Sequence, residues 1–114
     1  MEHNGDIAYL QNEVVKWADE VLPNRTVHQA LTKLVLEEIP EFLIDTTSAT
    51  EYADLIILIL DIAHLQGIDI KKAVLDKMRM NKKRKWSINP ETGIAQHVKS
   101  EIILHPKGDD PDEN

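Results

Sequence analysis

Apolar side chains recur every three or four residues along much of the chain, which is the period of amphipathic helices. From residue 6 to residue 21 this pattern predicts one helix, which a turn at residues 23–25 ends. Thr26 and Gln29 have the spacing of a capping box, so a second helix is expected to begin there. The positions expected to face the core are Ile7, Leu10, Val14, Trp17, Ala18 and Val21 in the first helix, and Ala30, Leu34, Leu36, Ile39 and Leu43 in the second.

Pro40 lies inside the second pattern. A proline there removes the hydrogen bond to the carbonyl of Leu36 and crowds that carbonyl, so the helix is expected to kink or split. The alternative is that the helix simply ends near Ile39. A kink would change the direction of Glu41.

The most apolar stretch, residues 55–60, belongs to a third predicted helix, from about residue 49 to residue 65. Ser48 and Glu51 again have capping-box spacing, so Glu51 either caps this helix or takes part in a site. Gly67 is expected as the C′ residue. Because apolar residues surround nearly the whole third helix, it should be buried on several sides, which predicts a homo-oligomer, a dimer or a tetramer built as a dimer of dimers.

Asp69 is the expected N-cap of a fourth helix over residues 70–85, with Ile70, Ala73, Val74 and Met78 facing inward. After Trp86 the sequence is expected to be irregular, with a turn at residues 89–93. Val98 and residues 102–104 are expected to form a strand or a docking arm. The fold class is therefore all-α: a four-helix bundle completed by oligomerisation, with an irregular C-terminal arm. Residues 1–106 form the predicted domain, and residues 107–114 a disordered acidic tail.

Composition narrows the chemistry. With 114 residues, 42% hydrophobic and 29% charged, the chain is typical of one soluble domain. It has no cysteine, which excludes disulfides, thiolate metal sites and cysteine catalysis. The absence of a signal peptide or a spanning segment predicts a cytoplasmic protein without membrane contact. The net charge of −7 disfavours specific nucleic-acid binding, but the basic residues concentrated at 77–85 indicate a local anionic ligand.

Acidic residues flank the apolar stretch at helical spacing. Glu37, Glu38 and Glu41 fall within an arc of about 100° on the second helix, and Glu51, Asp54 and Asp61 within about 80° on the third. If the two helices pack antiparallel, these carboxylates crowd together and repel. Oxygen-rich clusters of this kind suit a hard cation, so the sequence predicts an Mg²⁺ site, with Mn²⁺ able to substitute.

A second set of side chains suits phosphate. Lys77, Asn81 and Arg84 lie within about 60° of one another on the fourth helix. Metal ions, a basic face and a carboxylate acting as general base together favour attack of water on a phosphorus, with pyrophosphate as the leaving group.

The motif Glu37-Glu38-x-x-Glu41 followed by Glu51-x-x-Asp54 resembles the signature of the MazG-like all-α nucleoside triphosphate pyrophosphohydrolases. The segment Lys77-x-x-x-Asn81-x-x-Arg84-x-Trp86 is also similar to that group's lysine-asparagine-arginine segment. The resemblance covers about residues 28–97. The nine residues between Glu41 and Glu51 and the proline at position 40 depart from the usual pattern.

The resemblance implies a four-helix fold assembled as dimers or tetramers, and Mg²⁺-dependent hydrolysis of an NTP or dNTP to the monophosphate and pyrophosphate. Short stand-alone members, including phage enzymes acting on purine deoxynucleotides such as dATP and dGTP, are similar. By this resemblance, the implied metal ligands are Glu37, Glu38, Glu41, Glu51 and Asp54, where Glu51 would either bind metal or orient the other ligands. Glu38 or Glu41 would activate water, and Lys77, Asn81 and Arg84 would hold phosphate or sugar.

Several alternatives stay open. The chain could be a non-catalytic helical interaction module, or a phosphoribosyl-ATP pyrophosphohydrolase. Asp61 with His64 resembles half of a di-iron site, but Asp61 is better interpreted as an outer acid or an interface group. Trp17 is interpreted as a core residue rather than a stacking platform. Trp86 either shields a nucleobase or fills a subunit interface.

Overall fold

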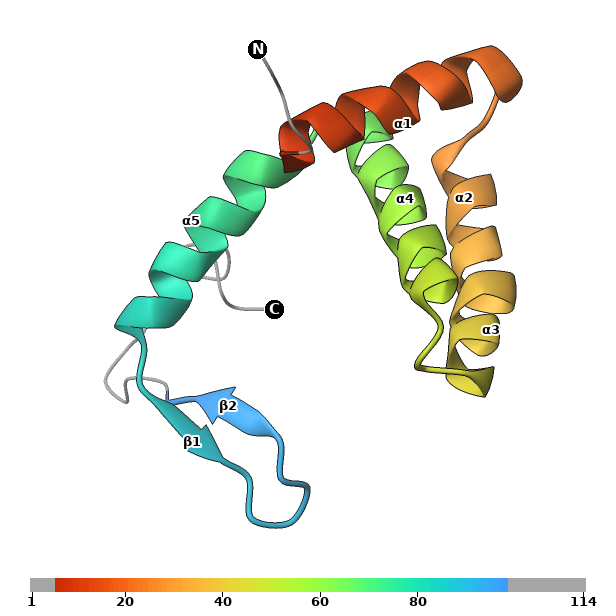
Figure 1. The fold of residues 1–114 in the computed structure, drawn as a ribbon. Helices are drawn as coiled ribbons and strands as arrows, with labels where there is room; N and C mark the ends of the chain where they lie inside the picture. The colour runs from red at the N-terminus through yellow and green to blue at the C-terminus, as the bar shows by residue number, and fades with distance from the viewer. Residues whose placement is uncertain (1–5, 99–114) are drawn as a thin grey trace. The chain divides into compact units, whose positions relative to one another are not determined.

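The computed structural model describes residues 6–98 and confirms the helical architecture (Figure 1). The chain divides into two compact units, Met1–Lys77 and Met78–Asn114. Within the described range, no helix has the length and apolar character needed to cross a membrane. The elements are α1 (Ile7–Val21), α2 (Val27–Lys33), the π-helical segment η1 (Leu34–Glu38), α3 (Ile39–Ile44), α4 (Ala49–Leu65), α5 (Ile70–Lys83), β1 (Trp86–Ile88) and β2 (Ala95–His97).

The ends of the helices follow the predicted local chemistry. At the start of α2 both halves of the capping box form, from Gln29 N–H to Thr26 Oγ1 and from Thr26 N–H to Gln29 Oε1, each at 3.1 Å. Helix α4 ends in a Schellman motif: the Ile68 N–H donates to the Ala63 carbonyl at 2.8 Å, and Gly67 has a φ of 75°. The predicted C′ glycine is therefore confirmed.

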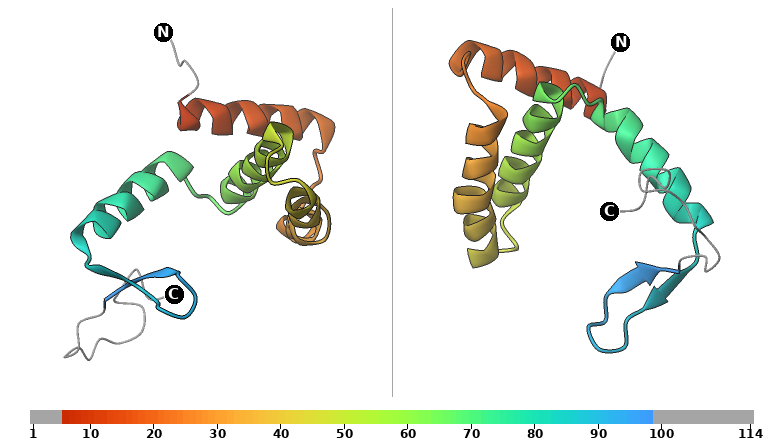
Figure 2. Two further views of the ribbon diagram at one scale, coloured as in Figure 1. Left: turned by 60° about the horizontal axis from the view of Figure 1, so that its bottom comes forward. Right: turned by 180° about the vertical axis from the view of Figure 1, so that it is seen from behind.

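In the first unit, α4 runs antiparallel to the continuous segment α2–η1–α3, and α1 crosses the end of both (Figures 1 and 2). Among the described residues of this unit, the buried apolar side chains are Val15, Ala18, Ala30, Leu60 and Ala63. Three of these five are alanines, which let the helices approach closely but supply little apolar volume. The core of this unit is consequently thin.

Gln11 on α1 supplies a polar tie across this core. Its amide nitrogen donates to the carbonyls of Leu60 at 3.0 Å and Ile68 at 3.2 Å, and its oxygen accepts from the Ile70 N–H at 3.3 Å. The residue is only 8% exposed, so these bonds satisfy an otherwise buried amide. Gln11 thereby fixes the connection between α4 and α5 to α1.

Asp61 forms a buried ion pair with Arg25. The guanidinium binds both carboxylate oxygens, through Nε at 2.6 Å and Nη2 at 2.7 Å, while Nη1 reaches Asp19 at 3.0 Å. These hydrogen bonds raise the pKa of Arg25 above its usual value, and the bonds to Asp61 make the largest contribution. This ion pair holds the α1–α2 turn against α4. The interpretation of Asp61 as an outer acid or an interface group stays a prediction.

A π-helical turn resolves the conflict at Pro40. Helical structure continues through α2, η1 and α3, and the N–H of Ile39 donates to the carbonyl of Leu34, five residues earlier. Pro40 then occupies the first turn of α3, where an absent N–H is tolerated. The alternative in which the helix ends near Ile39 is wrong, and the disturbance expected from proline takes the form of this wider turn.

Part of the predicted core face is uncovered. Leu36 is 69% exposed and Leu43 is 67% exposed, so their assignment to the core is wrong for the single subunit. The π turn changes the angular spacing that a regular 3.6-residue period assumes. Trp17, also predicted as core, is 54% exposed.

The second unit contains a β-hairpin where irregular structure was expected. Strands β1 and β2 pair antiparallel, with Trp86 opposite His97 and Ile88 opposite Ala95. The turn predicted at residues 89–93 is confirmed: the Gly93 N–H donates to the Asn89 carbonyl at 2.8 Å, and Gly93 has a φ of 72°. Strands of three residues are too short for an alternating pattern to be recognised. Residues 102–104 and 107–114, with their predicted arm and tail, lie outside the described residues.

Candidate functional site

Three glutamates converge where η1, α3 and α4 meet. Glu38, Glu41 and Glu51 each place a carboxylate oxygen within 4.8 Å of the others. Glu38 is buried, Glu51 is half-buried and Glu41 is exposed. The predicted meeting of the two acidic segments is thus observed, and it produces a concentration of negative charge at one end of the α3–α4 hairpin.

The local structure of the connecting loop leaves Glu51 available to this cluster. The predicted capping box at Ser48 is wrong, because Ser48 makes no side-chain cap bond and its hydroxyl instead lies 3.0 Å from the hydroxyl of Thr50. Asp45 stabilises the tight loop by accepting from the Thr47 N–H at 3.0 Å and from its hydroxyl at 2.6 Å. The short connection therefore directs Glu51 toward Glu38 and Glu41 instead of its own helix end.

The electrostatics of the cluster favour a cation. Desolvation, followed by repulsion from Glu41, Asp54 and Glu38, raises the pKa of Glu51. One oxygen each of Glu38 and Glu51 is buried and has no hydrogen-bond partner. Such orphaned carboxylate oxygens are unfavourable by themselves but suit a hard divalent cation such as Mg²⁺ or Mn²⁺. The residues present therefore fit a metal site.

Glu37 and Asp54 lie differently from the three clustered glutamates. Glu37 is exposed and binds the Lys33 ammonium at 2.9 Å. Asp54 is exposed, lies one helical turn after Glu51 on α4, and faces the same pocket as Glu38. Their predicted roles as metal ligands stay predictions.

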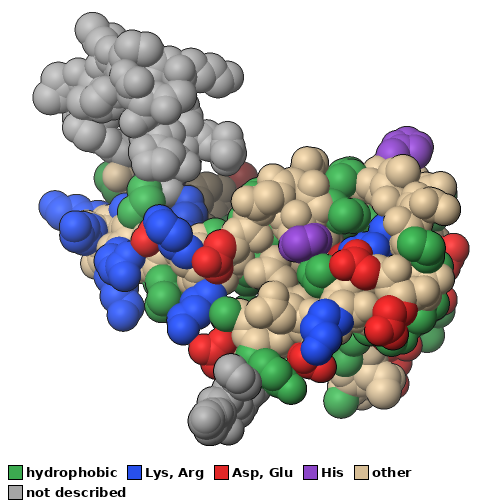
Figure 3. Space-filling view, turned by 90° about the horizontal axis from the view of Figure 1, so that it is seen from above, with side chains coloured by type: hydrophobic (Ala, Val, Ile, Leu, Met, Phe, Trp, Pro, Cys, Tyr) green, Lys and Arg blue, Asp and Glu red, His purple; other side chains and the backbone are tan. Residues whose placement is uncertain are grey.

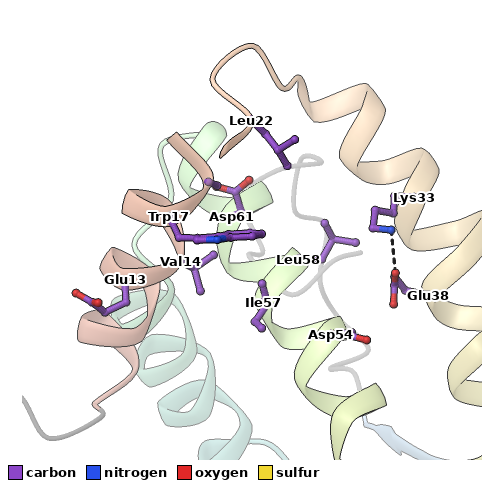
Figure 4. A pocket seen from close by; sticks show the side chains of 11 residues that line it. Glu13, Val14, Trp17, Leu22, Lys33, Glu38, Asp54, Ile57, Leu58 and Asp61 are labelled. Atoms are coloured by element: carbon purple, nitrogen blue, oxygen red, sulfur yellow. Dashed lines mark ion pairs between the residues drawn. The ribbon is translucent and has the colours of Figure 1, made fainter. Parts of the chain in front are cut away.

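A pocket of about 560 Å³ adjoins the acidic residues (Figure 4). Glu38, Lys33 and Asp54 form its polar end, Glu13 and Asp61 also line it, and apolar side chains form much of the remaining wall. Trp17 presents its ring to this space, which the interpretation of Trp17 as core did not anticipate. Its place in a regular apolar stripe gave no signal of this, because a stripe does not distinguish a core from a pocket wall. The apolar lining comprises Val14, Trp17, Ala18, Leu22, Ile57 and Leu58.

The remaining predicted substrate-binding residues lie on α5 and just beyond it. Lys and Arg side chains gather along α5 (Figure 3). Trp86 donates from Nε1 to the carbonyl of Asn81 at 2.8 Å, and its ring meets that of His97 edge-on at 6.0 Å. Arg84 Nη1 lies 3.4 Å from Nδ1 of the same histidine. The second unit thus holds Asn81, Arg84 and Trp86 together, while their role toward substrate stays a prediction, as does that of Lys77 at the end of the first unit.

Comparisons with known proteins find one matching family and several similar proteins. Residues 9–103 match the dATP/dGTP pyrophosphohydrolase family. The chain is 46% identical over 97 residues to a dATP/dGTP diphosphohydrolase of Salmonella phage PMBT28, covering 82% of this chain but only about a third of that relative's length, 32%. It is 34% identical over 94 residues to a dATP/dGTP diphosphohydrolase of Cyanophage S-2L, covering 81% of this chain and 88% of the relative.

A solved structure is similar as well. The Cyanophage S-2L MazG-like pyrophosphohydrolase, bound to dGDP and three catalytic Mn²⁺ ions per active site, superposes with a TM-score of 0.71 at 34% identity. The similarity covers 82% of this chain and 93% of that one. The likeness therefore extends over nearly the whole relative.

Removing the charge of Glu51 should stabilise the protein in the presence of a chelator. A raised pKa in the folded state means that ionisation of Glu51 costs more in the folded than in the unfolded chain. This penalty is absent below the unfolded-state pKa and is complete once the pH has risen through the folded-state pKa. With EDTA, Glu51→Gln should therefore have a higher Tm than wild type at pH 7.5, and the difference should vanish as the solution is acidified.

The control is Glu20→Gln, on the exposed surface of α1 and outside the cluster. The Tm values of wild type, Glu51→Gln and Glu20→Gln are measured by thermal denaturation, which is followed by circular dichroism. A lower Tm for Glu51→Gln at pH 7.5 would show that Glu51 is held by favourable contacts and is not repelled.

Proposed function

Because the chain belongs to the dATP/dGTP pyrophosphohydrolase family, a MazG-like group, we propose that it hydrolyses a purine deoxynucleoside triphosphate, dATP or dGTP, to the monophosphate and pyrophosphate. The observation that carries this proposal is the convergence of Glu38, Glu41 and Glu51, two of them with buried, unpartnered oxygens, beside a pocket of nucleoside size. The Cyanophage S-2L structure, with dGDP and Mn²⁺, supports the same ligand chemistry.

The carboxylates would hold the cofactor. Glu38, Glu41 and Glu51, together with Asp54 and Glu37, would ligate Mg²⁺, with Mn²⁺ able to substitute, because both cations prefer oxygen ligands. Divalent cations bound there supply stabilisation of the charge that develops during phosphoryl transfer. The same cations would compensate the negative charge of the cluster, which adds to desolvation in raising the pKa of Glu51.

The reaction assigned to these residues breaks the bond between the α- and β-phosphoryl groups. Glu38 or Glu41 accepts a proton from the attacking water, whose oxygen forms the new bond to the α-phosphorus while pyrophosphate departs. Lys77, Asn81 and Arg84 hold phosphate or sugar, as expected from the lysine-asparagine-arginine segment. The apolar pocket beside Glu38 receives the nucleoside.

Purified protein with Mg²⁺ should convert dATP or dGTP to the monophosphate and pyrophosphate, identified by ³¹P NMR. The panel includes the other dNTPs, ATP, GTP and phosphoribosyl-ATP. Glu38→Gln and Asp54→Asn should each lower kcat by at least about 100-fold, the scale of removing one charge-stabilising group in an active site. The matched control Glu20→Gln should keep wild-type turnover. Release of orthophosphate would contradict the proposed cleavage between the α- and β-phosphoryl groups. Preference for phosphoribosyl-ATP would contradict the proposal that the substrate is dATP or dGTP.

Trp17 is expected to contact the base, since an indole on the wall of an apolar pocket offers a stacking surface. Loss of base stacking costs about 1–3 kcal/mol. Trp17→Ala should therefore raise the KM for the preferred dNTP several-fold or more, whereas Trp17→Phe should retain most of the binding.

The comparison variant is Trp86→Ala, because Trp86 is the other predicted aromatic contact. Steady-state kinetics decide between them. A KM raised by Trp86→Ala and unchanged by Trp17→Ala would assign the base to Trp86.

The exposed apolar surface supports a homo-oligomer. Tyr52, Ile56 and Ile59 repeat at helical spacing along one face of α4 and are 51%, 50% and 43% exposed. Such a continuous stripe on a helix is typical of a protein interface. We propose that second copies of the chain cover this face, giving a dimer or a tetramer formed as a dimer of dimers.

Sedimentation velocity should give a species of two or four times the 13.0 kDa chain mass. Ile56→Asp should shift it toward the monomer, because a buried, unpaired carboxylate is unfavourable. The control Asn12→Asp, which adds the same charge at an exposed position of α1, should leave the mass unchanged. A wild-type monomer at micromolar concentration would refute the interface.

A further inference from the structure

Lys33, outside the acidic motif, binds two of its carboxylates. The ammonium lies 2.9 Å from an oxygen of Glu37 and 3.1 Å from Oε2 of Glu38. Figure 4 shows Lys33 and Glu38 directed toward one another at the polar end of the pocket. These hydrogen bonds, that of Glu37 first, raise the pKa of Lys33 above its usual value, so the ammonium stays charged at neutral pH.

The π turn makes the contact between Lys33 and Glu38 possible. The two residues are five positions apart, and on a regular α-helix such residues point about 140° away from each other. Hydrogen bonding of the i→i+5 type, which includes the Ile39 N–H to Leu34 carbonyl bond, brings residues five apart to the same side. The helical irregularity before Pro40 therefore aligns one cation with both neighbouring glutamates.

The two oxygens of Glu38 have different surroundings. Oε2 is bound by Lys33, whereas Oε1 is buried without a hydrogen-bond partner. The whole residue is only 7% exposed, and one of its oxygens lies within 4.8 Å of oxygens of Glu41 and Glu51. A carboxylate held at one oxygen has little rotational freedom, so the other oxygen has a defined direction.

We propose that Lys33 is a positioning residue for the metal site: its ammonium holds Oε2 of Glu38 and thereby presents Oε1 to the cation. Glu37 holds the same ammonium in place, which gives it a second role toward the site besides that of the predicted ligand. The proposal rests on the metal site of the proposed function and adds to it a residue outside the glutamate and aspartate motif. Lys33 also places a positive charge beside a buried carboxylate.

Mn²⁺ binding without nucleotide tests this role by isothermal titration calorimetry. Lys33→Met should weaken Mn²⁺ binding by about 10- to 100-fold, the usual effect of removing a partner that orients a metal ligand. Lys33→Arg, which keeps a charged donor, should restore most of the affinity. The control Lys72→Met removes an exposed helical ion pair of the same kind, with Asp76 at 2.8 Å, and should not change the affinity.

The opposite result also has a clear meaning. If Lys33 only competes with the cation for Glu38, Lys33→Met will bind Mn²⁺ more tightly than wild type, and the positioning role is refuted. An unchanged affinity refutes it as well. Circular dichroism in EDTA verifies that each variant keeps its helices. Should Lys33→Met not fold, Lys33→Gln, which also removes the charge, carries the test with the same expected loss of affinity.

A double-mutant cycle separates the two possible roles of Glu37. Glu37→Gln alone should weaken Mn²⁺ binding, and the effect should disappear in the Lys33→Met background if Glu37 acts through Lys33. A persistent effect would make Glu37 a direct ligand and remove its indirect role. Wild-type protein that binds no Mn²⁺ would refute the metal site itself, whereas binding that is indifferent to residue 33 refutes only the positioning.

Discussion

Mutual repulsion among closely spaced carboxylates is the constraint around which this protein is built. Glu38, Glu41 and Glu51 bring oxygens within 4.8 Å of one another, and desolvation together with repulsion from the neighbouring carboxylates raises the pKa of Glu51. The ammonium of Lys33 opposes this repulsion from the side of Glu38. Three carboxylates carry more charge than this ammonium offsets, so the arrangement suits divalent metal ions.

The surrounding structure shows how such a cluster is tolerated. The first unit has a thin apolar core, rich in alanine, and relies on specific polar contacts between helices. Gln11 ties α1 to the end of α4, and the bidentate pair of Arg25 with Asp61 ties the α1–α2 turn to the same helix. These directional contacts fix the positions of the helices without filling the space between them. A pocket lined by residues of α1 and α4 therefore remains.

Irregular backbone geometry helps to place the side chains of the site. A strictly α-helical second segment would turn Lys33 and Glu38 to different sides, but the π turn aligns them and places Pro40 in the first turn of α3. Similarly, the missing side-chain cap at Ser48 leaves Glu51 free to face Glu38. Each departure from ideal helix chemistry therefore coincides with a residue of the acidic cluster.

The sequence by itself determined the helices, the capping at Thr26, the glycine at position 67 and the two acidic segments, because these depend on local periodicity and on side chains a few residues apart. It could not determine that the side chain of Glu51 faces Glu38 and Glu41, that Asp61 pairs with Arg25, or that Trp17 lines a pocket. Those outcomes depend on partners tens of residues away or on a neighbouring helix surface. Only tertiary packing decided which acids share one small volume, since spacing places carboxylates on a face but does not place that face against another.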